Sequence, residues 1–322
     1  MRVAIDTTPL VQTRAGTARH VLGLLRELRG RPGLELVGVA AGGTGRLATI
    51  RRDAVWYPLR LGRVSSQVDV LHCTTFRAPV SPRAPLVVTV HDLALLRHPE
   101  AFPQWHRRTG ALALRSAVRA ADAIVAVSAF TRDELVDLLR VPVERVRVVP
   151  NGVDPVFSFD GPAVEGDYVL AVGTLEPRKN LAATVEAAQL AGIEVRVAGA
   201  AGWGGVETAG WVGEPSDEEL AALMRGARCL VYPSLYEGFG IPVLEAMACG
   251  IPVVTSRGGA TEEVAGGAAI LVDPHDPASI AAGIEEAGRR RDSLVEIGRA
   301  RASMFTWRRA ADLVEDLWRE LA

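Results

Sequence analysis

Two carboxylates flank a short glycine-rich segment in the second half of the chain. Glu237 opens the segment, and Glu245 follows eight residues further on. An ionised carboxylate only accepts hydrogen bonds, so two of them in one loop suit a ligand with many hydroxyl donors, such as a sugar or a ribose. We predict that the residues directly after Glu237 contact the same ligand; they are Gly238, Phe239 and Gly240.

The residues around this segment predict the elements that hold it. The apolar range 230–234 is typical of a short buried strand. Pro242 suits the first position of a helix, where its missing N–H costs nothing, and Gly250 marks the end of that helix. We therefore expect Glu237 beyond the carboxyl end of a strand and Glu245 in the first helical turn. Open α/β sheets bind their ligands at this place.

A second glycine-led loop carries two cations. Gly173 ends a strand-like run, and Arg178 and Lys179 stand just before a helical stretch. Lys179 is the only lysine in the sequence. Free N–H groups at a helix N-terminus and two side-chain cations together make an anion site, and pyrophosphate is the anion we expect. The alternative is a surface loop with an ordinary basic pair.

Two positions in the first half carry weaker signals. His91, followed by Asp92, ends the apolar run 86–90. A histidine there can bond a phosphate oxygen or a sugar hydroxyl, or handle a proton, but a structural role is equally open. Gly16 lies in the loop after the first strand, where it could let the backbone approach a ligand or simply form a turn. The other histidines have no metal-ligand spacing, so we expect no metal site.

One motif in the first half is misleading. The range 43–48 fits the pattern G-x-G-x-x-A of dinucleotide-binding loops. It follows the second strand-like run instead of the first, and the segment behind it carries Arg51 and Arg52 and no convincing long helix. We interpret the range as a solvent loop. The turn after the first strand, where such a fingerprint belongs, has none, and this argues against a Rossmann oxidoreductase.

The composition indicates two domains with an aliphatic core. The chain has 322 residues, of which 48% are hydrophobic and 5% aromatic, and no run of 18 apolar residues could span a membrane. Asp6 stands too early for a secretory signal, and the three cysteines form neither a disulfide framework nor a zinc pattern. We expect a cytoplasmic protein.

The net charge of −2 hides two halves of opposite sign. Residues 1–150 contain 22 arginines and 12 acidic residues, a balance of +10, and residues 151–322 contain 14 basic and 26 acidic residues, a balance of −12. The basic half could contact an anionic membrane at its inner face or an anionic acceptor, or could be a solvated surface; we expect no nucleic-acid partner. Four arginines share about a third of the circumference of the predicted helix 104–121: Arg107, Arg108, Arg115 and Arg119.

Strand-like and helical runs alternate, and the pattern runs twice. Apolar strands that alternate with helices predict parallel sheets covered on both faces. The segment 151–167 separates the two rounds, with a boundary near residue 157, and the spacing in 306–321 predicts an amphipathic helix. Strands are expected at 3–6, 34–40, 68–73, 86–91, 123–128 and 146–150, and then at 168–173, 195–199, 230–234, 253–256 and 269–273.

Taken together, the motifs resemble the retaining glycosyltransferases of family four, and in particular bacterial mannosyl- or glucosyltransferases. The resemblance rests on E-G-F-G-I-P-V-L-E-A-M-A-C-G-I-P-V-V, on G-T-L-E-P-R-K-N, on the turn 151–154, on Ser128 and on His91. It implies the GT-B architecture, an α/β fold of two facing Rossmann-like domains with a cleft between them. The acceptor domain would span 1–157 and the nucleotide-sugar domain 158–305, and 306–322 would be a helix that crosses back to the first domain.

The same resemblance implies an activity. The chain would move a hexose from a GDP- or UDP-linked sugar to a saccharide or lipid-linked acceptor, with retention of configuration, without a metal and with no cofactor other than this co-substrate. A sugar-nucleotide epimerase or a non-catalytic nucleotide-sugar-binding subunit on the same fold is the alternative.

Roles for single residues also follow from the resemblance. Glu237 would hold hydroxyls of the donor sugar, Glu245 the ribose, and Arg178 and Lys179 the leaving diphosphate. His91 would contact the sugar or the β-phosphate. Gly16 would approach the phosphates, although the chain has Ala15-Gly16 where many relatives have two glycines.

Overall fold

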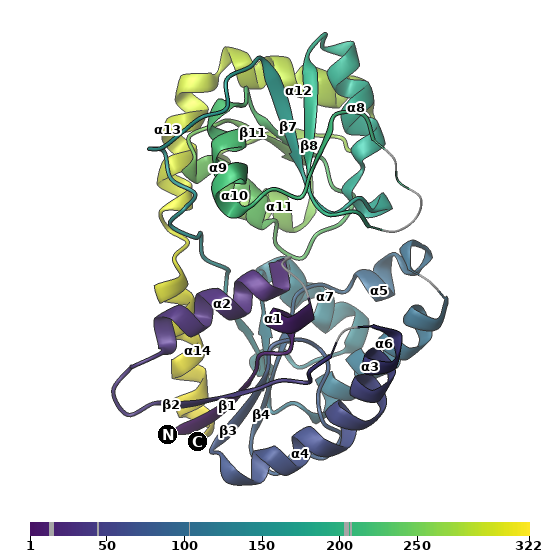
Figure 1. Cartoon of the computed structure of the whole chain (residues 1–322), viewed down its shortest axis with the longest axis vertical. Coiled ribbons are helices and arrows are strands. Elements are labelled where there is room, and N and C mark those ends of the chain that lie inside the picture. The colour runs from purple at the N-terminus through teal and green to yellow at the C-terminus, as the bar shows by residue number, and fades with distance from the viewer. Residues whose placement is uncertain (13–15, 44, 103, 203–205, 207) are drawn as a thin grey trace. The chain divides into compact units, whose positions relative to one another are not determined.

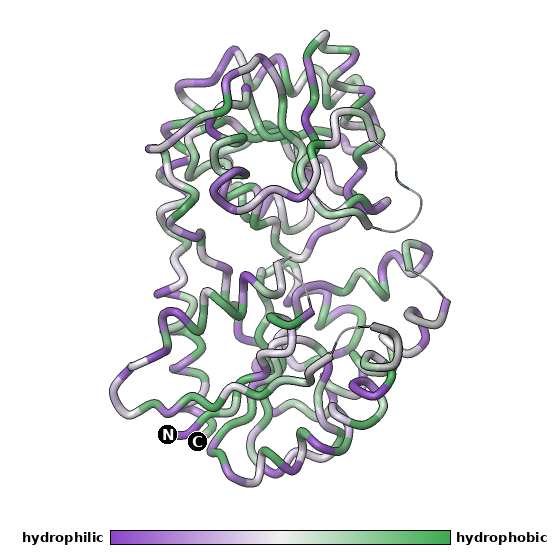
Figure 2. Tube along the Cα trace, in the orientation of Figure 1, coloured by the Kyte–Doolittle hydropathy of each residue, from purple (hydrophilic) through white to green (hydrophobic). Residues whose placement is uncertain are grey.

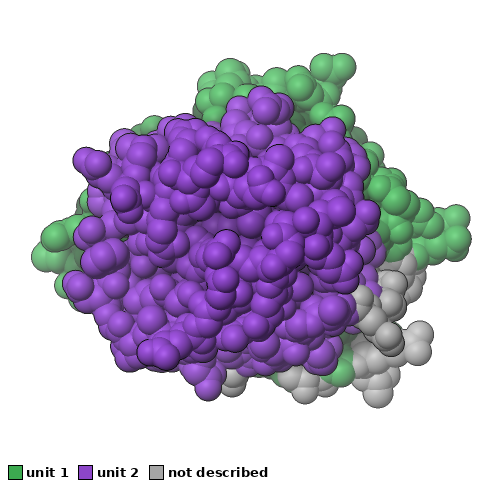
Figure 3. All heavy atoms as spheres, turned by 90° about the horizontal axis from the view of Figure 1, so that it is seen from above, with its two compact units in different colours: residues 1–152, 307–322 green, residues 153–306 purple. Residues whose placement is uncertain are grey.

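The computed structural model describes residues 1–12, 16–43, 45–102, 104–202, 206 and 208–322 (Figure 1). They form two compact units, which Figure 3 shows in different colours. Unit 1 comprises 1–152 and 307–322, and unit 2 comprises 153–306. The chain therefore passes between the units twice, and the backbone N–H of Val153 donates to the carbonyl of Phe305 at 3.1 Å beside these passages. The boundary we predicted near residue 157 lies a few residues beyond the first passage.

Unit 1 is built on a parallel sheet of six strands in the order β2-β1-β3-β4-β5-β6. All six strands were predicted to within two residues at either end, because each is a short apolar run between polar segments. They are β1 (Arg2–Asp6), β2 (Glu35–Val39), β3 (Val70–Cys73), β4 (Leu86–Val90), β5 (Ala123–Ala126) and β6 (Val146–Val148).

Helices cover both faces of this sheet, because the central strands bury apolar side chains on both faces. Figure 2 shows the strands of this sheet largely in green, the colour of hydrophobic residues. Val87 and Val88 are neighbours on β4 and both are fully buried, yet they belong to different hydrophobic clusters. The helical segments of unit 1 are α1 (Pro9–Gln12), α2 (Gly16–Leu28), α3 (Arg46–Arg51), η1 (Arg52–Arg60), α4 (Leu61–Val64), η2 (Ser65–Gln67), α5 (Ala94–Arg97), η3 (Pro99–Ala101), α6 (Gln104–Ala120), α7 (Ala129–Leu139), η4 (Val143–Arg145) and α14 (Trp307–Leu321).

Residues 46–64 correct one prediction, since they are helical where we expected a solvent loop without a long helix. Tyr57 and Leu61 stand four residues apart in this stretch, and both are buried in the core of unit 1. Pro58 lies inside the stretch, and the segment around it is π-helical. A proline inside a helix removes one backbone hydrogen bond, which explains why the sequence pattern did not indicate a helix here.

The helix α14 completes unit 1 by packing against α2. Trp318 is fully buried, and its ring centroid lies 5.6 Å from that of His72 on β3. Trp307 lies over Gly23 of α2 so closely that a Cβ added at Gly23 would come within 2.1 Å of the indole carbon Cδ2. The absence of a side chain at Gly23 thus makes room for Trp307.

Unit 2 contains a second parallel sheet of six strands, in the order β12-β11-β10-β7-β8-β9. We missed β9, because Trp211 and Val212 are each 47% exposed at the sheet edge and form no apolar run. The strands are β7 (Tyr168–Val172), β8 (Glu194–Ala198), β9 (Trp211–Gly213), β10 (Leu230–Tyr232), β11 (Val253–Ser256) and β12 (Ile270–Val272).

The two central strands of this sheet place the loops that carry the predicted site. β7 and β10 pair in parallel, so the loops that follow them leave the same edge of the sheet side by side. The helical segments are η5 (Pro177–Lys179), α8 (Leu181–Leu190), α9 (Asp217–Gly226), α10 (Ile241–Ala248), α11 (Gly259–Ala265), α12 (Pro277–Arg289) and α13 (Arg291–Ala302).

Substitution Gly23→Ala should destabilise unit 1. The added methyl group collides with the indole of Trp307, and overpacking of this kind costs about 1–3 kcal/mol. Gly288→Ala in α12 is the matched control, because nothing lies within 4 Å of a Cβ there and alanine favours a helix by up to about 1 kcal/mol. Urea denaturation followed by tryptophan fluorescence measures both. Equal stability of the two variants would contradict the close contact between α2 and α14.

Candidate functional site

The loop after β10 carries Glu237 and leads into α10. Gly240 caps this helix with φ at 99°, a backbone conformation that side chains disfavour, and a Cβ there would lie 3.0 Å from Cγ2 of Thr261. The helix begins at Ile241, so Pro242 is its second residue and not the first as we predicted. Glu245 accordingly lies in the second turn of α10, which corrects its predicted place in the first turn. Its side chain is buried at 1% exposure.

The loop after β7 carries Arg178 and Lys179 on the short helix η5. Gly173 has φ at 153°, and a Cβ there would come within 3.1 Å of the stem of Lys179. Asn180 adopts the left-handed conformation and donates from its amide to the carbonyls of Pro233 (3.1 Å) and Pro274 (2.6 Å). These contacts hold the loop against the segments that follow β10 and β12.

Lys179 and Glu237 meet between the two loops. The lysine Nζ donates to Oε1 of Glu237 at 2.5 Å and to the hydroxyl of Tyr232 at 2.9 Å. The Tyr232 hydroxyl in turn donates to the same Oε1 at 2.8 Å. Lysine, tyrosine and glutamate therefore form a closed triangle of hydrogen bonds, and the Lys179 and Glu237 side chains are only 12% and 10% exposed.

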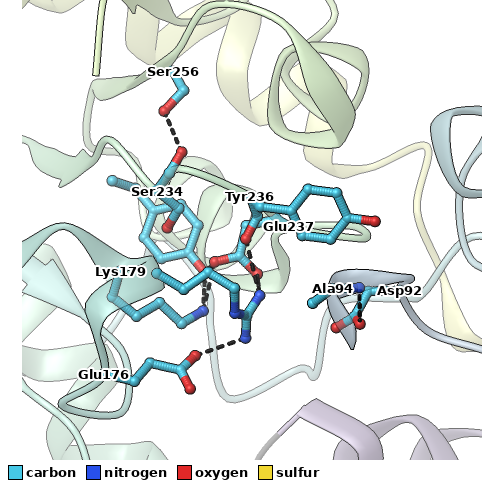
Figure 4. A network of polar contacts seen from close by, with 10 residues as sticks. Asp92, Ala94, Glu176, Lys179, Ser234, Tyr236, Glu237 and Ser256 are labelled. Carbon is cyan, nitrogen blue, oxygen red and sulfur yellow. Dashed lines mark hydrogen bonds and ion pairs between the residues drawn. The ribbon is translucent and has the colours of Figure 1, made fainter. Parts of the chain in front are cut away.

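Arg178 joins this triangle to a second carboxylate. Its Nη1 donates to the carbonyl of Tyr236 at 2.9 Å and lies 3.5 Å from Oε2 of Glu237. Its Nη2 donates to Oε1 of Glu176 at 2.6 Å. Figure 4 shows Glu176, Lys179 and Glu237 pointing toward one another. We call the set Glu176, Arg178, Lys179 and Glu237 the charge cluster; it holds two acids and two bases.

The charge cluster separates the pKa values of its members. Burial acts to raise the pKa of Glu237, but the charges of Lys179 and Arg178 outweigh it and lower that pKa to about 2. Burial acts to lower the pKa of Lys179, but the charge of Glu237 outweighs it and raises the pKa. Burial raises the pKa of Glu176, since the nearby Arg178 and Lys179 offset it only in part. Glu237 and Lys179 thus remain charged at neutral pH, whereas Glu176 is the carboxyl nearest to taking up a proton.

His91 lies in unit 1, directly after β4. Its Nε2 lies 2.9 Å from the carbonyl oxygen of Thr74, so Nε2 donates and the neutral ring carries its proton there. Burial lowers the pKa of His91, although Thr74 and Asp92 oppose the shift. His20 of α2 meets the His91 ring edge to face at 4.9 Å between centroids. Among the residues that the structure describes, no group of His, Cys, Asp or Glu side chains could hold a metal ion.

The remaining predicted residues are placed as follows. Gly16 is exposed at the start of α2, while Arg14 and Ala15 before it lie outside the described residues. Ser128 caps α7, its hydroxyl oxygen accepting from the N–H of Thr131 at 3.0 Å, so helix capping accounts for it. Phe239 is buried, and its ring packs edge to face against Phe305 at 6.0 Å.

The structure brings together Arg178, Lys179 and Glu237, as a single site would need, and adds two residues that we did not predict. Glu176 stands two positions before Arg178, and Tyr232 is the last residue of β10. An acid beside a basic pair was a signal in the sequence that we overlooked. Tyr232 gave none, because an aromatic residue in a buried strand is ordinary.

Known proteins resemble this chain over most of its length. Residues 14–157 match the family model described as Glycosyltransferase Family 4, and residues 157–302 match Glycosyl transferases group 1. O-antigen chain mannosyltransferase B of Escherichia coli is 36% identical over 69% of the chain, which is 66% of that relative's length, just under two thirds. D-inositol 3-phosphate glycosyltransferase of Geodermatophilus obscurus is 30% identical over 96% of the chain and 77% of its own length.

A solved structure has the same fold. Anabaena HepE, determined with UDP and glucose, superposes with a TM-score of 0.77 at 19% identity, and the match covers all of both chains. At this identity the likeness concerns the fold alone. It agrees with the prediction of a GT-B α/β architecture made from two parallel sheets with helices.

The contact between Lys179 and Glu237 should appear as strong coupling in a double-mutant cycle. Lys179→Met or Glu237→Gln leaves a nearly buried charge without its partner and should cost about 3–5 kcal/mol of unfolding free energy. The double variant should cost clearly less than the sum of the two. Urea denaturation at pH 7 measures all three, and additive losses would contradict the pairing.

The exposed pair Asp167 and Arg228 provides the control cycle, since side-chain exposures of 69% and 58% predict negligible coupling.

The contribution of Glu237 to the unfolding free energy should depend on pH with a defined sign. The folded-state pKa of Glu237, about 2, lies below the usual value of a glutamate. The ionised carboxylate therefore adds to the unfolding free energy above about pH 4.3, and urea denaturation should show this stability being lost as the pH falls toward 2.

Proposed function

Because the chain belongs to glycosyltransferase family 4, we propose that it transfers a hexose, mannose or glucose, from a nucleoside diphosphate sugar to a hydroxyl acceptor with retention of configuration. The observation that carries the proposal is the charge cluster. Two fixed cations and two carboxylates converge at the carboxyl ends of adjacent parallel strands, where α/β sheets bind nucleotides.

The proposed reaction breaks the bond between the anomeric carbon and the diphosphate oxygen. Negative charge builds up on that oxygen, and Arg178 and Lys179 would stabilise it electrostatically in the role that a divalent cation can otherwise play. Since these cations are already held by hydrogen bonds, little reorganisation is needed when the charge develops. The acceptor oxygen forms the new bond to the anomeric carbon on the same face, and its proton passes to the departing phosphate oxygen.

The carboxylates would recognise the donor. Glu237 stays ionised, so it can accept hydrogen bonds from sugar hydroxyls, and Glu245 on α10 would accept from the ribose. Gly173, Gly238 and Gly240 would let the backbone come close to the nucleotide.

In unit 1, His91 and Gly16 would contact the sugar and the phosphates. A neutral His91 offers an unprotonated Nδ1, because Thr74 holds the proton on Nε2. Nδ1 could therefore accept a hydrogen bond from a sugar hydroxyl.

The nature of the donor is supported by the relatives. The E. coli relative is named a mannosyltransferase and HepE was solved with UDP and glucose, so GDP-mannose and UDP-glucose are the donors to test first. The acceptor would be a saccharide or a lipid-linked sugar, and the protein would work in the cytoplasm. A sugar-nucleotide epimerase would instead release an epimerised nucleotide sugar, and a non-catalytic binding subunit would bind a donor without turnover.

A membrane is the second partner we propose, on the observation of one helix face. Arg108, Arg115 and Arg119 of α6 are exposed, and Leu112 between them is 67% exposed. The helix contains no acidic residue. Basic side chains around an exposed leucine suit the headgroups of an anionic bilayer. The contact we propose is a peripheral one. Among the described residues, no helix is both long and apolar enough to cross a bilayer.

A panel of nucleotides and one substitution test the proposed transferase. The preferred nucleotide among UDP, GDP, ADP and their sugars should raise the Tm, because a ligand that binds only the folded state stabilises it. Lys179→Ala should then lower kcat/KM with that donor by about 30- to 1000-fold, the loss of one preorganised donor of roughly 2–4 kcal/mol. Arg289→Ala, at an exposed position of α12, is the control. Near-normal turnover of Lys179→Ala would overturn the role of the cluster.

The membrane contact predicts selective sedimentation with vesicles. The protein should pellet with vesicles of phosphatidylglycerol and phosphatidylcholine but not with phosphatidylcholine alone, and 0.5 M salt should release it, since added salt on the order of 0.5 M strongly screens exposed charges. Arg108→Gln/Arg115→Gln should weaken the binding several-fold. Arg289→Gln/Arg290→Gln removes as much charge elsewhere and should not. Equal binding of both double variants would contradict an α6 surface.

A further inference from the structure

The charge cluster carries no net positive charge that would attract an anion. Glu176 and Glu237 balance Arg178 and Lys179 when all four are ionised, and each cation already lies against a carboxylate. A diphosphate brings further negative charge into this set. Its binding is therefore opposed unless one carboxylate loses its charge or swings away from the cations.

The two carboxylates differ in how they are held. Both oxygens of Glu237 have partners, Oε1 with Lys179 and Tyr232 and Oε2 with Arg178. Glu176 accepts from Arg178 through Oε1, but its Oε2 is buried and, within the part of the chain that the structure describes, has no hydrogen-bond partner. The Glu176 side chain is only 3% exposed. A buried anionic oxygen without a donor is costly, and neutralising it with a proton lowers that cost.

We propose that Glu176 sets the charge of the phosphate site by taking up a proton when a nucleoside diphosphate sugar binds. The inference rests on the proposed function, since it needs a diphosphate at Arg178 and Lys179. For each nucleotide sugar bound, one proton leaves hydronium or the buffer acid, where its bond breaks, and forms one O–H bond at Oε2 of Glu176. The cluster then carries a charge of +1, and the neutral carboxyl can donate a hydrogen bond from Oε2 to a phosphate oxygen.

The other charged groups around Glu176 do not titrate in the same range. Arg178, Lys179 and Glu237 face it from the loops after β7 and β10. Lys179 stays protonated because its pKa is raised, and Glu237 stays ionised with a pKa of about 2. Burial already raises the pKa of Glu176, and an arriving diphosphate raises it further. Because the protonated form binds better, affinity should fall as the pH rises, by at most about tenfold per pH unit for one proton.

Calorimetry in several buffers tests this directly. UDP-glucose and GDP-mannose are titrated at pH 7.5 into the wild-type protein in buffers that differ in ionisation enthalpy. Both probes are diphosphate diesters, so they lack the phosphate proton that UDP or GDP titrates near pH 6. The dependence of the observed enthalpy on the buffer gives the number of protons taken up, and we expect a substantial fraction of one proton for the donor that binds. Binding without proton uptake would overturn the inference while leaving the proposed function intact.

Substitution then assigns the proton to its residue. Glu176→Gln should abolish the uptake and flatten the affinity between pH 6.5 and 8.5, with binding at the upper end as tight as the wild type or several-fold tighter. Glu186→Gln removes an exposed carboxylate of α8 in the same unit and should keep the wild-type behaviour. If Glu176→Gln still takes up the proton, whether or not its affinity for the nucleotide sugar falls, the inference is overturned. Glu176 would then only hold Arg178 in place. If neither donor binds the folded wild-type protein, this inference and the proposed function both fail.

Discussion

The ion pair between Lys179 and Glu237 is the interaction on which the candidate site depends. It joins the loops after two neighbouring parallel strands, which the backbone hydrogen bond from the N–H of Leu235 to the carbonyl of Arg178 (2.9 Å) also ties together. Other features of these loops serve the same contact. Gly173 makes room for the lysine stem, Asn180 ties the lysine loop to the opposite segment, and Tyr232 supplies a hydroxyl between the two charges.

The same contacts bring stability and function into competition. Cations that hold the loops together are also the cations that a diphosphate would need, and a carboxylate that neutralises them opposes an incoming anion. The cluster reconciles these demands through the different surroundings of its two acids. Both oxygens of Glu237 have donors and it keeps its charge, while Glu176 has one oxygen without a donor among the described residues, which a proton can neutralise. When their surroundings separate the pKa values of two carboxyl groups, one group can stay ionised while the other carries a proton, so that the two play different roles in one site.

Much of this arrangement could be predicted from the sequence. Short apolar runs indicated every strand except β9, whose half-exposed edge residues carry no pattern. The cations and Glu237 were predicted from residue type and position, because charged residues in glycine-containing loops between a strand and a helix suit an anion or a hydroxyl-rich ligand. The pairing between them was not, since contacts between loops distant in sequence depend on strand order. The start of α10 was misplaced by one residue because Pro242 is tolerated at either of the first two helical positions, and Glu245 moved to the next turn with it.

The return of α14 to unit 1 has a consequence for the order in which the protein is made. All of unit 2 is synthesised between the two parts of unit 1, and the core that Trp307 and Trp318 fill stays open until α14 has left the ribosome. During that interval the apolar face formed by Val21, Leu24 and Val87 lacks its cover. Unit 2 is contiguous and can close its own sheet earlier. Nascent unit 1 is therefore the part of the chain that a chaperone would have to shield.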